Sequence, residues 1–234
     1  IRYWKSTHPD IPVLGLHETQ DEANTITTMT INDISIALLN YTYGTNGIKV
    51  QNDVVVDYID KEKIKKDIAN ARANGAEVLC VCIHWGVEYI LLPNAQQKEL
   101  ANFLTEEGVD LIIGGHPHVV QDYEVLTAAD GRRVPVMYSL GNLVSNQRWE
   151  NSNGGIITTV DIDRKTKKIV KIDYVPCYVH KGTLFDEKRN YYCIPTTDYL
   201  SGKLPFTLPN DSIEQELILF HNNTVNRIPT TPVE

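Results

Sequence analysis

The chain has 234 residues, of which 42% are hydrophobic and 22% are charged, a composition typical of a globular protein and not of a disordered one. Its formal net charge of −8 at pH 7 argues against broad nucleic-acid binding, so we expect no nucleic-acid partner. The sequence contains no run of about 18 apolar residues, the length that a membrane-spanning helix needs.

Two β-rich runs near the start of the chain predict a hairpin, because residues 26–32 and 34–41 flank a short polar turn. Further along, Asp60 is placed to cap a helix over residues 61–74, where apolar residues recur at helical spacing. The first part of the chain is therefore predicted to mix strands and helices.

A strand–helix–strand unit follows. Residues 78–83 and 109–113 are continuous apolar runs, typical of strands that are buried on both faces of a sheet. Between them, Asn94 and Gln97 have the spacing of a capping box at the start of a second helix. The two strands are therefore predicted to be parallel, with a right-handed crossover.

The remainder of the chain is predicted to be rich in strands, over residues 123–127, 134–139, 155–162 and 169–179. The last two are expected to pair as a hairpin whose solvated tip is the basic run 164–168. Ser212 and Gln215 have capping-box spacing for a last helix that ends near Asn223, and the segment 228–234 is expected to be loose.

Three histidines follow directly on the two predicted parallel strands. His84 comes after the first strand, and His116 and His118 come after the second, on either side of a proline. Because the carboxyl ends of parallel strands form one edge of a sheet, these imidazoles are expected to meet there. A single histidine after a strand is ordinarily structural, but three in this arrangement favour a metal site, in which a metal-bound water can serve as the nucleophile.

Five further residues are candidates to support these histidines. Glu88 can act as a ligand or general base, or be an ordinary exposed acid, and Asn142 can bind a ligand or simply occupy a turn. Gln121 can orient His116 or His118 or lie at the surface, and Trp85 can line the pocket or pack in the core. Ser139 lies in the same run of five residues as Asn142, from Tyr138 to Asn142, and is expected to support the site from behind the ligands.

The other histidines and the cysteines are expected to have no part in the site. Cys80 and Cys82 point to the same face of one strand, so they are interpreted as free buried thiols rather than a disulfide or a metal site. The remaining histidines do not share the strand-end context and are interpreted as surface or structural residues: His8, His17, His180 and His221.

Taken together, the motifs His84-Trp85-Gly86-x-Glu88-Tyr89, Gly114-x-His116-Pro117-His118-Val119-x-Gln121 and Tyr138-Ser139-Leu140-Gly141-Asn142 resemble the CapA family of poly-gamma-glutamate capsule synthesis proteins. That family is similar in turn to the calcineurin-like metallophosphoesterases. The resemblance covers most of residues 1–180 and implies an α/β (α+β sandwich) fold, a two-sheet αββα architecture that lacks its N-terminal part. Residues 181–234 are expected to be a C-terminal extension packed on the same domain, with a helix near 211–223.

The resemblance also implies divalent metal ions (Mn, Zn or Fe), two of them in the complete protein, with His84 and His116 on one metal and His118 on the other. In that superfamily the remaining ligands come earlier in the chain, as an Asp-x-His, a Gly-Asp and an Asn-His pair, and none of these is present here. We therefore expect the chain alone to be inactive and to pack against a missing N-terminal segment or a second copy of itself.

Three functions remain open at this point. The first is a metal-dependent phosphoesterase-like hydrolase, or a transferase, in the synthesis or export of a poly-gamma-glutamate-type capsule polymer, with Glu88 and Asn142 as catalytic residues. The second is non-catalytic binding of an anionic cell-surface polymer, and the third is a structural role with no metal. The resemblance places the protein at the extracellular face of the cytoplasmic membrane, held there only by an N-terminal anchor that this sequence lacks.

Overall fold

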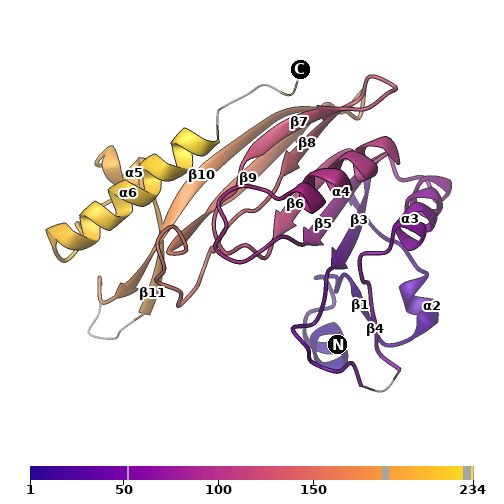
Figure 1. Ribbon diagram of the computed structural model, residues 1–234, viewed down its shortest axis with the longest axis horizontal. Coiled ribbons are helices and arrows are strands. Elements are labelled where there is room, and N and C mark those ends of the chain that lie inside the picture. The colour runs from indigo at the N-terminus through magenta and orange to yellow at the C-terminus, as the bar shows by residue number, and fades with distance from the viewer. Residues whose placement is uncertain (52, 186–189, 229–232, 234) are drawn as a thin grey trace.

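The computed structural model describes residues 1–51, 53–185, 190–228 and 233. Its largest sheet has six strands in the order β2-β3-β5-β6-β8-β7 (Figure 1). The central strands β3, β5, β6 and β8 are parallel, and the edge strands β2 and β7 are antiparallel to their neighbours. The bounds of these strands are β2 Thr27–Ile31, β3 Ile34–Thr42, β5 Val78–His84, β6 Leu111–Gly115, β7 Tyr123–Thr127 and β8 Arg133–Met137.

Two helices, α3 (Lys61–Ala73) and α4 (Ala95–Glu106), cover one face of this sheet and close a core that includes Leu79, Leu104 and Ile112. The predicted caps are confirmed. The Asp60 side chain accepts a hydrogen bond from the Lys63 amide, and both hydrogen bonds of the capping box are formed at the start of α4. Such caps satisfy backbone groups that a helix end would otherwise leave unpaired, so these two helices start where the sequence predicts.

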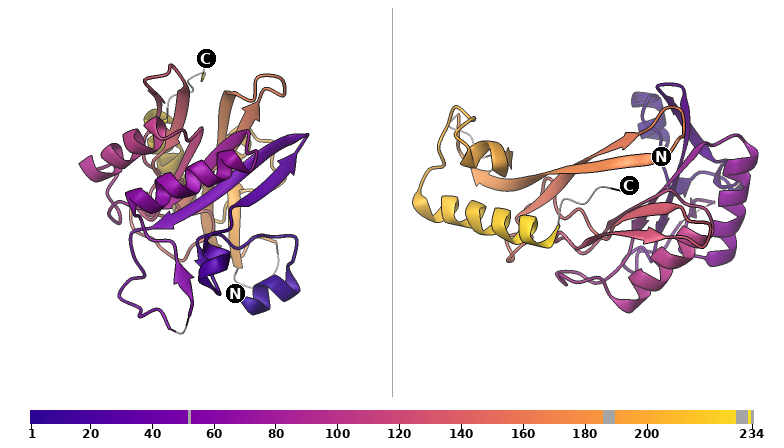
Figure 2. Two further views of the ribbon diagram at one scale, coloured as in Figure 1. Left: turned by 90° about the vertical axis from the view of Figure 1, so that its right-hand side faces the viewer. Right: turned by 90° about the horizontal axis from the view of Figure 1, so that it is seen from above.

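A second sheet with the strand order β11-β10-β9 lies against the other face and shares a second core with it (Figure 2). Its strands are β9 Gly154–Ile162, β10 Ile169–Gly182 and β11 Asn190–Pro195. Helix α6 (Asp211–Arg227) packs along β10 through Leu217 and Phe220, and the short helix α5 (Thr196–Leu200) lies beside it. The antiparallel pairing of β9 with β10 confirms the predicted hairpin, with residues 164–168 at its tip.

The N-terminal elements form a small unit beside the main sheet, made of α1 Arg2–Thr7, β1 Leu16–His17, α2 Gln20–Ala23 and β4 Val55–Val56. A buried polar network joins this unit to the core. His17 Nε2 lies 2.8 Å from Asp57 Oδ2, Lys63 Nζ lies 2.7 Å from Asp67 Oδ2, and the Tyr41 hydroxyl donates to Asp67 at 2.9 Å. Because a buried charge is tolerated only when it is paired, this network defines how the N-terminal unit docks.

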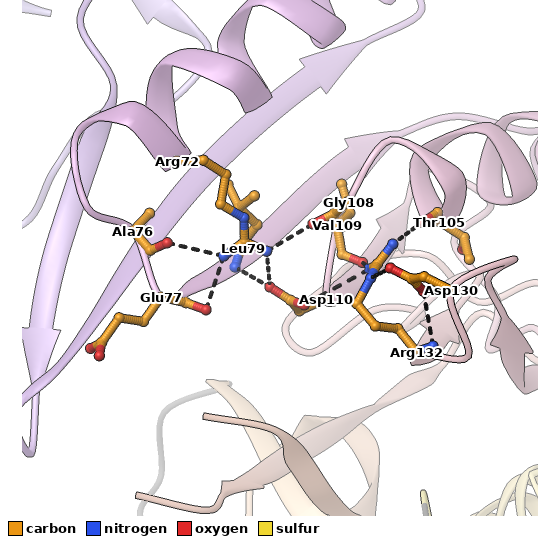
Figure 3. Close-up of polar contacts among 10 residues, drawn as sticks. All are labelled: Arg72, Ala76, Glu77, Leu79, Thr105, Gly108, Val109, Asp110, Asp130 and Arg132. Carbon is orange, nitrogen blue, oxygen red and sulfur yellow. Dashed lines mark hydrogen bonds and ion pairs between the residues drawn. The ribbon is translucent and has the colours of Figure 1, made fainter. Parts of the chain in front are cut away.

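A cluster of charged side chains lies at the starts of β5 and β6 (Figure 3), whereas His84 lies at the other end of β5. Arg72, in the last turn of α3, donates to the Ala76 carbonyl at 3.0 Å and to Asp110 Oδ2 at 2.6 Å. The Asp110 carboxylate also accepts from the Leu79 amide at 2.8 Å, and Arg132 donates to the carbonyls of Val109 and Thr105. The cluster therefore ties the helix ends to the starts of β5 and β6.

Several details of the C-terminal part differ from the sequence-based expectation. The N-cap of α6 is Asn210, not Ser212, and the helix continues to Arg227 beyond the predicted end at Asn223. Of the segment expected to be loose, Ile228 and Val233 are buried, whereas residues 229–232 and 234 lie outside the described residues. All four cysteines are free; Cys80 is buried as predicted, whereas Cys82, also predicted to be buried, is only partly so, and Cys193 is exposed. No helix in the described ranges is long and apolar enough to cross a membrane.

Candidate metal centre

The parallel strands β5 and β6 bring the three predicted histidines to one edge of the six-stranded sheet. His84 is in register with Gly115, so the residue that ends β5 lies directly beside the end of β6. The ring centroids of His84 and His116 are 4.6 Å apart, and those of His116 and His118 are 6.1 Å apart. Imidazoles from two separate stretches of the sequence thus share one small region, because adjacent parallel strands end together.

The loop that carries His116 and His118 has an unusual backbone conformation at both histidines. Both residues have positive φ angles, 97° for His116 and 59° for His118, which residues other than glycine seldom adopt. Such conformations persist only where the surroundings enforce them, and they are concentrated at functional sites. The proline between the two histidines fixes its own φ and limits the alternatives of this turn.

Beneath this loop, Gly114 allows β6 to approach Tyr138 and Trp85 closely. A Cβ atom at Gly114 would lie 2.1 Å from the Tyr138 carbonyl oxygen and 2.4 Å from Trp85 Nε1. The Trp85 indole donates a hydrogen bond of 2.8 Å to that same carbonyl, and the side chain is buried in the core. Of the two roles considered for Trp85, the structure therefore supports core packing directly under the site.

Glu88 joins two of the imidazoles to form a set of metal-type ligands. One ligand atom each from Glu88, His116 and His118 lies within 4.8 Å of the others, and Glu88 Oε1 is 3.8 Å from His118 Nε2. Ligands held at about 2.0–2.2 Å from a divalent ion lie roughly 3–4 Å from one another. The exposed Glu88 side chain would therefore need to move by only about 1 Å, so these donors fit a divalent ion.

The protonation state of the imidazoles also suits a metal ligand, since only the neutral ring offers a lone pair. Burial lowers the pKa of His84, and the neighbouring His116 and His118 lower it further. Burial is likewise the main cause that lowers the pKa of His116, while the Glu88 carboxylate partly opposes it. Both rings are therefore kept neutral at a lower pH than a histidine in water.

Asn142 determines which nitrogen of His118 can bind an ion. Its amide nitrogen donates to Gln147 Oε1 at 2.9 Å and to the Ser152 carbonyl at 2.8 Å, so the amide oxygen faces His118. That oxygen lies 3.0 Å from His118 Nδ1 and can only accept a hydrogen bond. The proton of His118 is then on Nδ1, and Nε2, the nitrogen that faces Glu88, keeps its lone pair for a metal.

Gln121 and Ser139 do not hydrogen-bond the imidazoles among the residues that the structure describes, although Gln121 was a candidate to orient His116 or His118. The buried Gln121 side chain accepts from Gln97 Nε2 at 2.8 Å and donates to the Ile90 carbonyl at 2.7 Å, and it has no hydrogen bond to a histidine within the described part of the chain. It therefore anchors the loop that carries Glu88 to helix α4. Ser139 is buried, and its hydroxyl accepts from the Gly141 amide at 3.2 Å in the turn before Asn142.

Two tyrosines at the site were not predicted from the sequence. The Tyr43 ring stacks on His84 at 5.7 Å between centroids and lies 4.7 Å from the His116 ring. The Tyr89 ring stacks on His118 at 5.9 Å, with a positive φ of 64°. One signal for Tyr43 was available, because it directly follows β3, the parallel neighbour of β5.

The remaining histidines have structural settings outside this centre, in agreement with their interpretation. His17 contacts Asp57, His221 Nδ1 lies 2.8 Å from the Thr196 hydroxyl, and His180 is buried beside Tyr192. His8 is exposed near Trp4. The three imidazoles at the ends of β5 and β6 are therefore distinguished by their convergence with one another.

Two curated proteins of capsule or PGA biosynthesis are similar to this chain in sequence. The chain is 25% identical over 224 residues to the capsule biosynthesis protein CapA of Bacillus anthracis, covering 89% of this chain and 51% of the relative. It is 29% identical over 176 residues to the PGA biosynthesis protein CapA of Bacillus subtilis (strain 168), covering 74% of this chain and 44% of the relative. The chain thus spans about half the length of the curated relatives that it matches.

Among solved structures, the NAD nucleotidase NadN of Haemophilus influenzae superposes with a TM-score of 0.52 at 13% sequence identity, over 97% of this chain and 44% of that one. At this identity the likeness concerns the fold alone. The chain has the mixed α/β fold with two packed sheets that the sequence predicts, and it shares this fold with the nucleotidase. Residues 1–147 match the family described as bacterial capsule synthesis protein PGA_cap, and the chain therefore belongs to that family.

Proposed function

We propose that this chain carries part of a divalent-metal centre in a protein of capsule-polymer synthesis or export, and that the centre acts on a phosphoester or on an anionic polymer. The observation that carries the proposal is that Glu88, His116 and His118 place one ligand atom each within 4.8 Å of one another, with the His84 ring centroid 4.6 Å from that of His116. The family membership and the names of the two Bacillus relatives support the capsule-related role and a place in the cell envelope.

The metal-type ligands Glu88, His116 and His118 include a single carboxylate, which favours a centre that further acidic groups complete. Glu88 is the one carboxylate grouped with the imidazoles within the described ranges, so a divalent ion here would keep most of its positive charge. A second ion beside the first would need bridging negative ligands to reduce the repulsion between them. We therefore propose that another segment of the protein, or a second copy of this chain, supplies carboxylates to the centre.

The chemistry expected of such a site is hydrolysis or transfer at a phosphoryl group. When bound, divalent ions lower the pKa of water and stabilise the negative charge that develops on the phosphoryl oxygens. Within this chain, His84 and His116 remain neutral and available as ligands, and Asn142 holds the proton of His118 on Nδ1. Glu88, exposed at the rim, is placed to accept a proton from a nucleophile or to complete the ligand set.

A second candidate function is non-catalytic handling of an anionic polymer by the same centre. It is favoured by the net charge of −8, which repels a polyanion unless metal ions or local cations offset it. In that case the metal would bridge protein and polymer, and removing the metal would abolish polymer binding.

Metal analysis and turnover together separate these functions. The full-length protein is loaded with Mn²⁺ or Zn²⁺, its bound metal is quantified by plasma mass spectrometry, and hydrolysis of bis(p-nitrophenyl) phosphate is followed. The His116→Ala variant is expected to lose both bound metal and turnover, and His221→Ala, outside the centre, is the matched control. Bound metal without turnover in the unmodified protein would favour polymer handling, whereas no bound metal would rule out both functions.

A further inference from the structure

A second cavity lies apart from the imidazole cluster and has a different chemical character. It measures about 530 Å³ and opens between helix α4, the start of β7 and the C-terminal part of α6. This volume is within the range of roughly 300–1,000 Å³ that small-molecule sites occupy. None of the three residues grouped as metal-type ligands lines it. It is therefore a separate candidate for ligand binding.

Charged side chains of both signs line this cavity, and they come from different elements. Asp122 and Glu124 lie at the start of β7, whereas Lys98 comes from α4 and Arg227 from the last turn of α6. The four charges sum to zero, in a chain whose formal net charge is −8. Acidic groups at the strand and basic groups on the two helices thus line the same cavity.

These charges do not neutralise one another through direct hydrogen bonds. Arg227 Nε lies 3.9 Å from Asp122 Oδ1, which is beyond hydrogen-bonding distance, and Arg227 Nη1 donates instead to the Val120 carbonyl at 3.1 Å. Among the described residues, the Asp122 carboxylate accepts no hydrogen bond, and Lys98 forms no ion pair within 4.0 Å. The guanidinium is therefore held in place by the main chain while a neighbouring carboxylate and an ammonium keep unused bonding capacity.

Glu124 is positioned differently, since the Tyr138 hydroxyl donates a hydrogen bond to it and fixes one of its oxygens. Burial raises the pKa of Asp122, and Arg227 and Lys98 oppose that effect without cancelling it. A carboxylate that is partly removed from water and incompletely paired gains from an added positive group. The two carboxylates of the cavity therefore favour a cation, although Lys98 and Arg227 add two positive charges to the same lining.

We infer that this cavity binds a zwitterion of amino-acid or dipeptide size, with its ammonium against Asp122 and Glu124 and its carboxylate against Lys98 and Arg227. A simple anion would bring its charge close to the two carboxylates, and a simple cation would meet the two basic side chains. A zwitterion pairs with both sets and leaves the cavity neutral. Asn226, on the same helix as Arg227, also lines the cavity and can hydrogen-bond the peptide group of a ligand, whereas the Asn223 amide nitrogen donates to Asn151 Oδ1 at 2.7 Å.

One residue of the cavity lining, Tyr138, also contacts the residues that support the imidazoles. Tyr138, whose hydroxyl holds Glu124, also offers its carbonyl to the Trp85 indole directly after His84. The same residue therefore contacts both the cavity and the tryptophan that packs under the imidazoles. The cavity shares no lining residue with the group of metal-type ligands, so its ligand binding is expected whether or not the imidazoles bind a metal.

The test is calorimetric titration of the chain with dialanine, compared with N-acetyl-dialanine, which lacks the ammonium, and dialanine amide, which lacks the carboxylate. The ammonium and the carboxylate of dialanine each form charge-assisted hydrogen bonds, so each blocked ligand should bind about tenfold or more weakly than dialanine. No saturable binding of dialanine, or equal binding of all three ligands, would overturn the inference.

Two variants test which side chain of the cavity binds the ammonium of the ligand and which binds its carboxylate. In Asp122→Asn the preference for the free ammonium over the acetylated ligand should fall at least severalfold, and in Lys98→Gln the preference for the free carboxylate should fall. Lys66→Gln, an exposed lysine on α3, is the matched control and should keep both preferences. Circular dichroism establishes that each variant is folded, and unchanged preferences in folded Asp122→Asn and Lys98→Gln would also contradict the assignment.

Discussion

Replacing Gly114 by alanine tests whether close packing under the histidine loop stabilises the fold as the structure indicates. The added Cβ would lie 2.1 Å from the Tyr138 carbonyl oxygen and 2.4 Å from Trp85 Nε1. Neither atom belongs to a flexible side-chain end, so β6 must move away from β8 or the indole must rotate. Gly115, the next residue, is the matched control, because a Cβ added there would meet no atom of the described residues within 4 Å.

The expected destabilisation has two parts. Rotation of Trp85 would break its 2.8 Å hydrogen bond to Tyr138 and leave a buried donor without a partner, which costs about 1–3 kcal/mol. Forcing an extra methyl group into a closely packed region costs about another 1–3 kcal/mol. The free energy of unfolding of Gly114→Ala should therefore fall by roughly 2–6 kcal/mol.

Urea unfolding followed by tryptophan fluorescence and far-ultraviolet circular dichroism measures this difference. Gly115→Ala should remain within about 0.5 kcal/mol of the unmodified chain, as is usual for surface-type substitutions. A loss below about 0.5 kcal/mol for Gly114→Ala, or an equal loss in both variants, would refute the proposed packing of β6 against Trp85 and Tyr138.

Three further outcomes follow from other contacts. Arg72→Ala, which removes the hydrogen bonds to the Ala76 carbonyl and Asp110, should lower the free energy of unfolding by about 1–3 kcal/mol in urea titrations, whereas Lys66→Ala should not change it measurably. Asn142→Leu should weaken Zn²⁺ binding about 10–100-fold by calorimetry, because His118 loses the partner that orients it. The pKa values of His84 and His116 are lowered from 6.5, so below pH 6.5 the unfolded chain binds more protons than the folded one. The free energy of unfolding should therefore rise with pH through this window, and replacing both histidines by glutamine should flatten the rise.

Local sequence patterns predicted the elements that carry the site. The apolar run at residues 78–83 matches β5, the run at 109–113 overlaps β6, which lies two residues later, and the predicted capping box at Asn94 and Gln97 is formed. These predictions succeeded because a buried parallel strand and a capped helix depend mainly on residues close together in the chain. The meeting of the imidazoles at one edge then followed from the parallel arrangement.

Features that depend on distant partners were not predictable in the same way. Strands β1 and β4 have two residues each and pair only with one another in the described part of the chain, so no local periodicity marks them. Asn210 and Ser212 are both favourable N-cap residues, and local chemistry could not distinguish them. The hydrogen bonds of Gln121 to Gln97 and Ile90, rather than to a histidine, likewise depend on how α4 packs against the loop.

The most direct test of the metal centre is X-ray absorption at the zinc edge for the chain loaded with Zn²⁺. Scattering from at least two imidazole rings at about 2.0–2.1 Å is expected, with loss of one ring in His116→Ala. A spectrum with oxygen ligands alone, or one that His116→Ala leaves unchanged, would show that the histidines at the ends of β5 and β6 do not bind the ion.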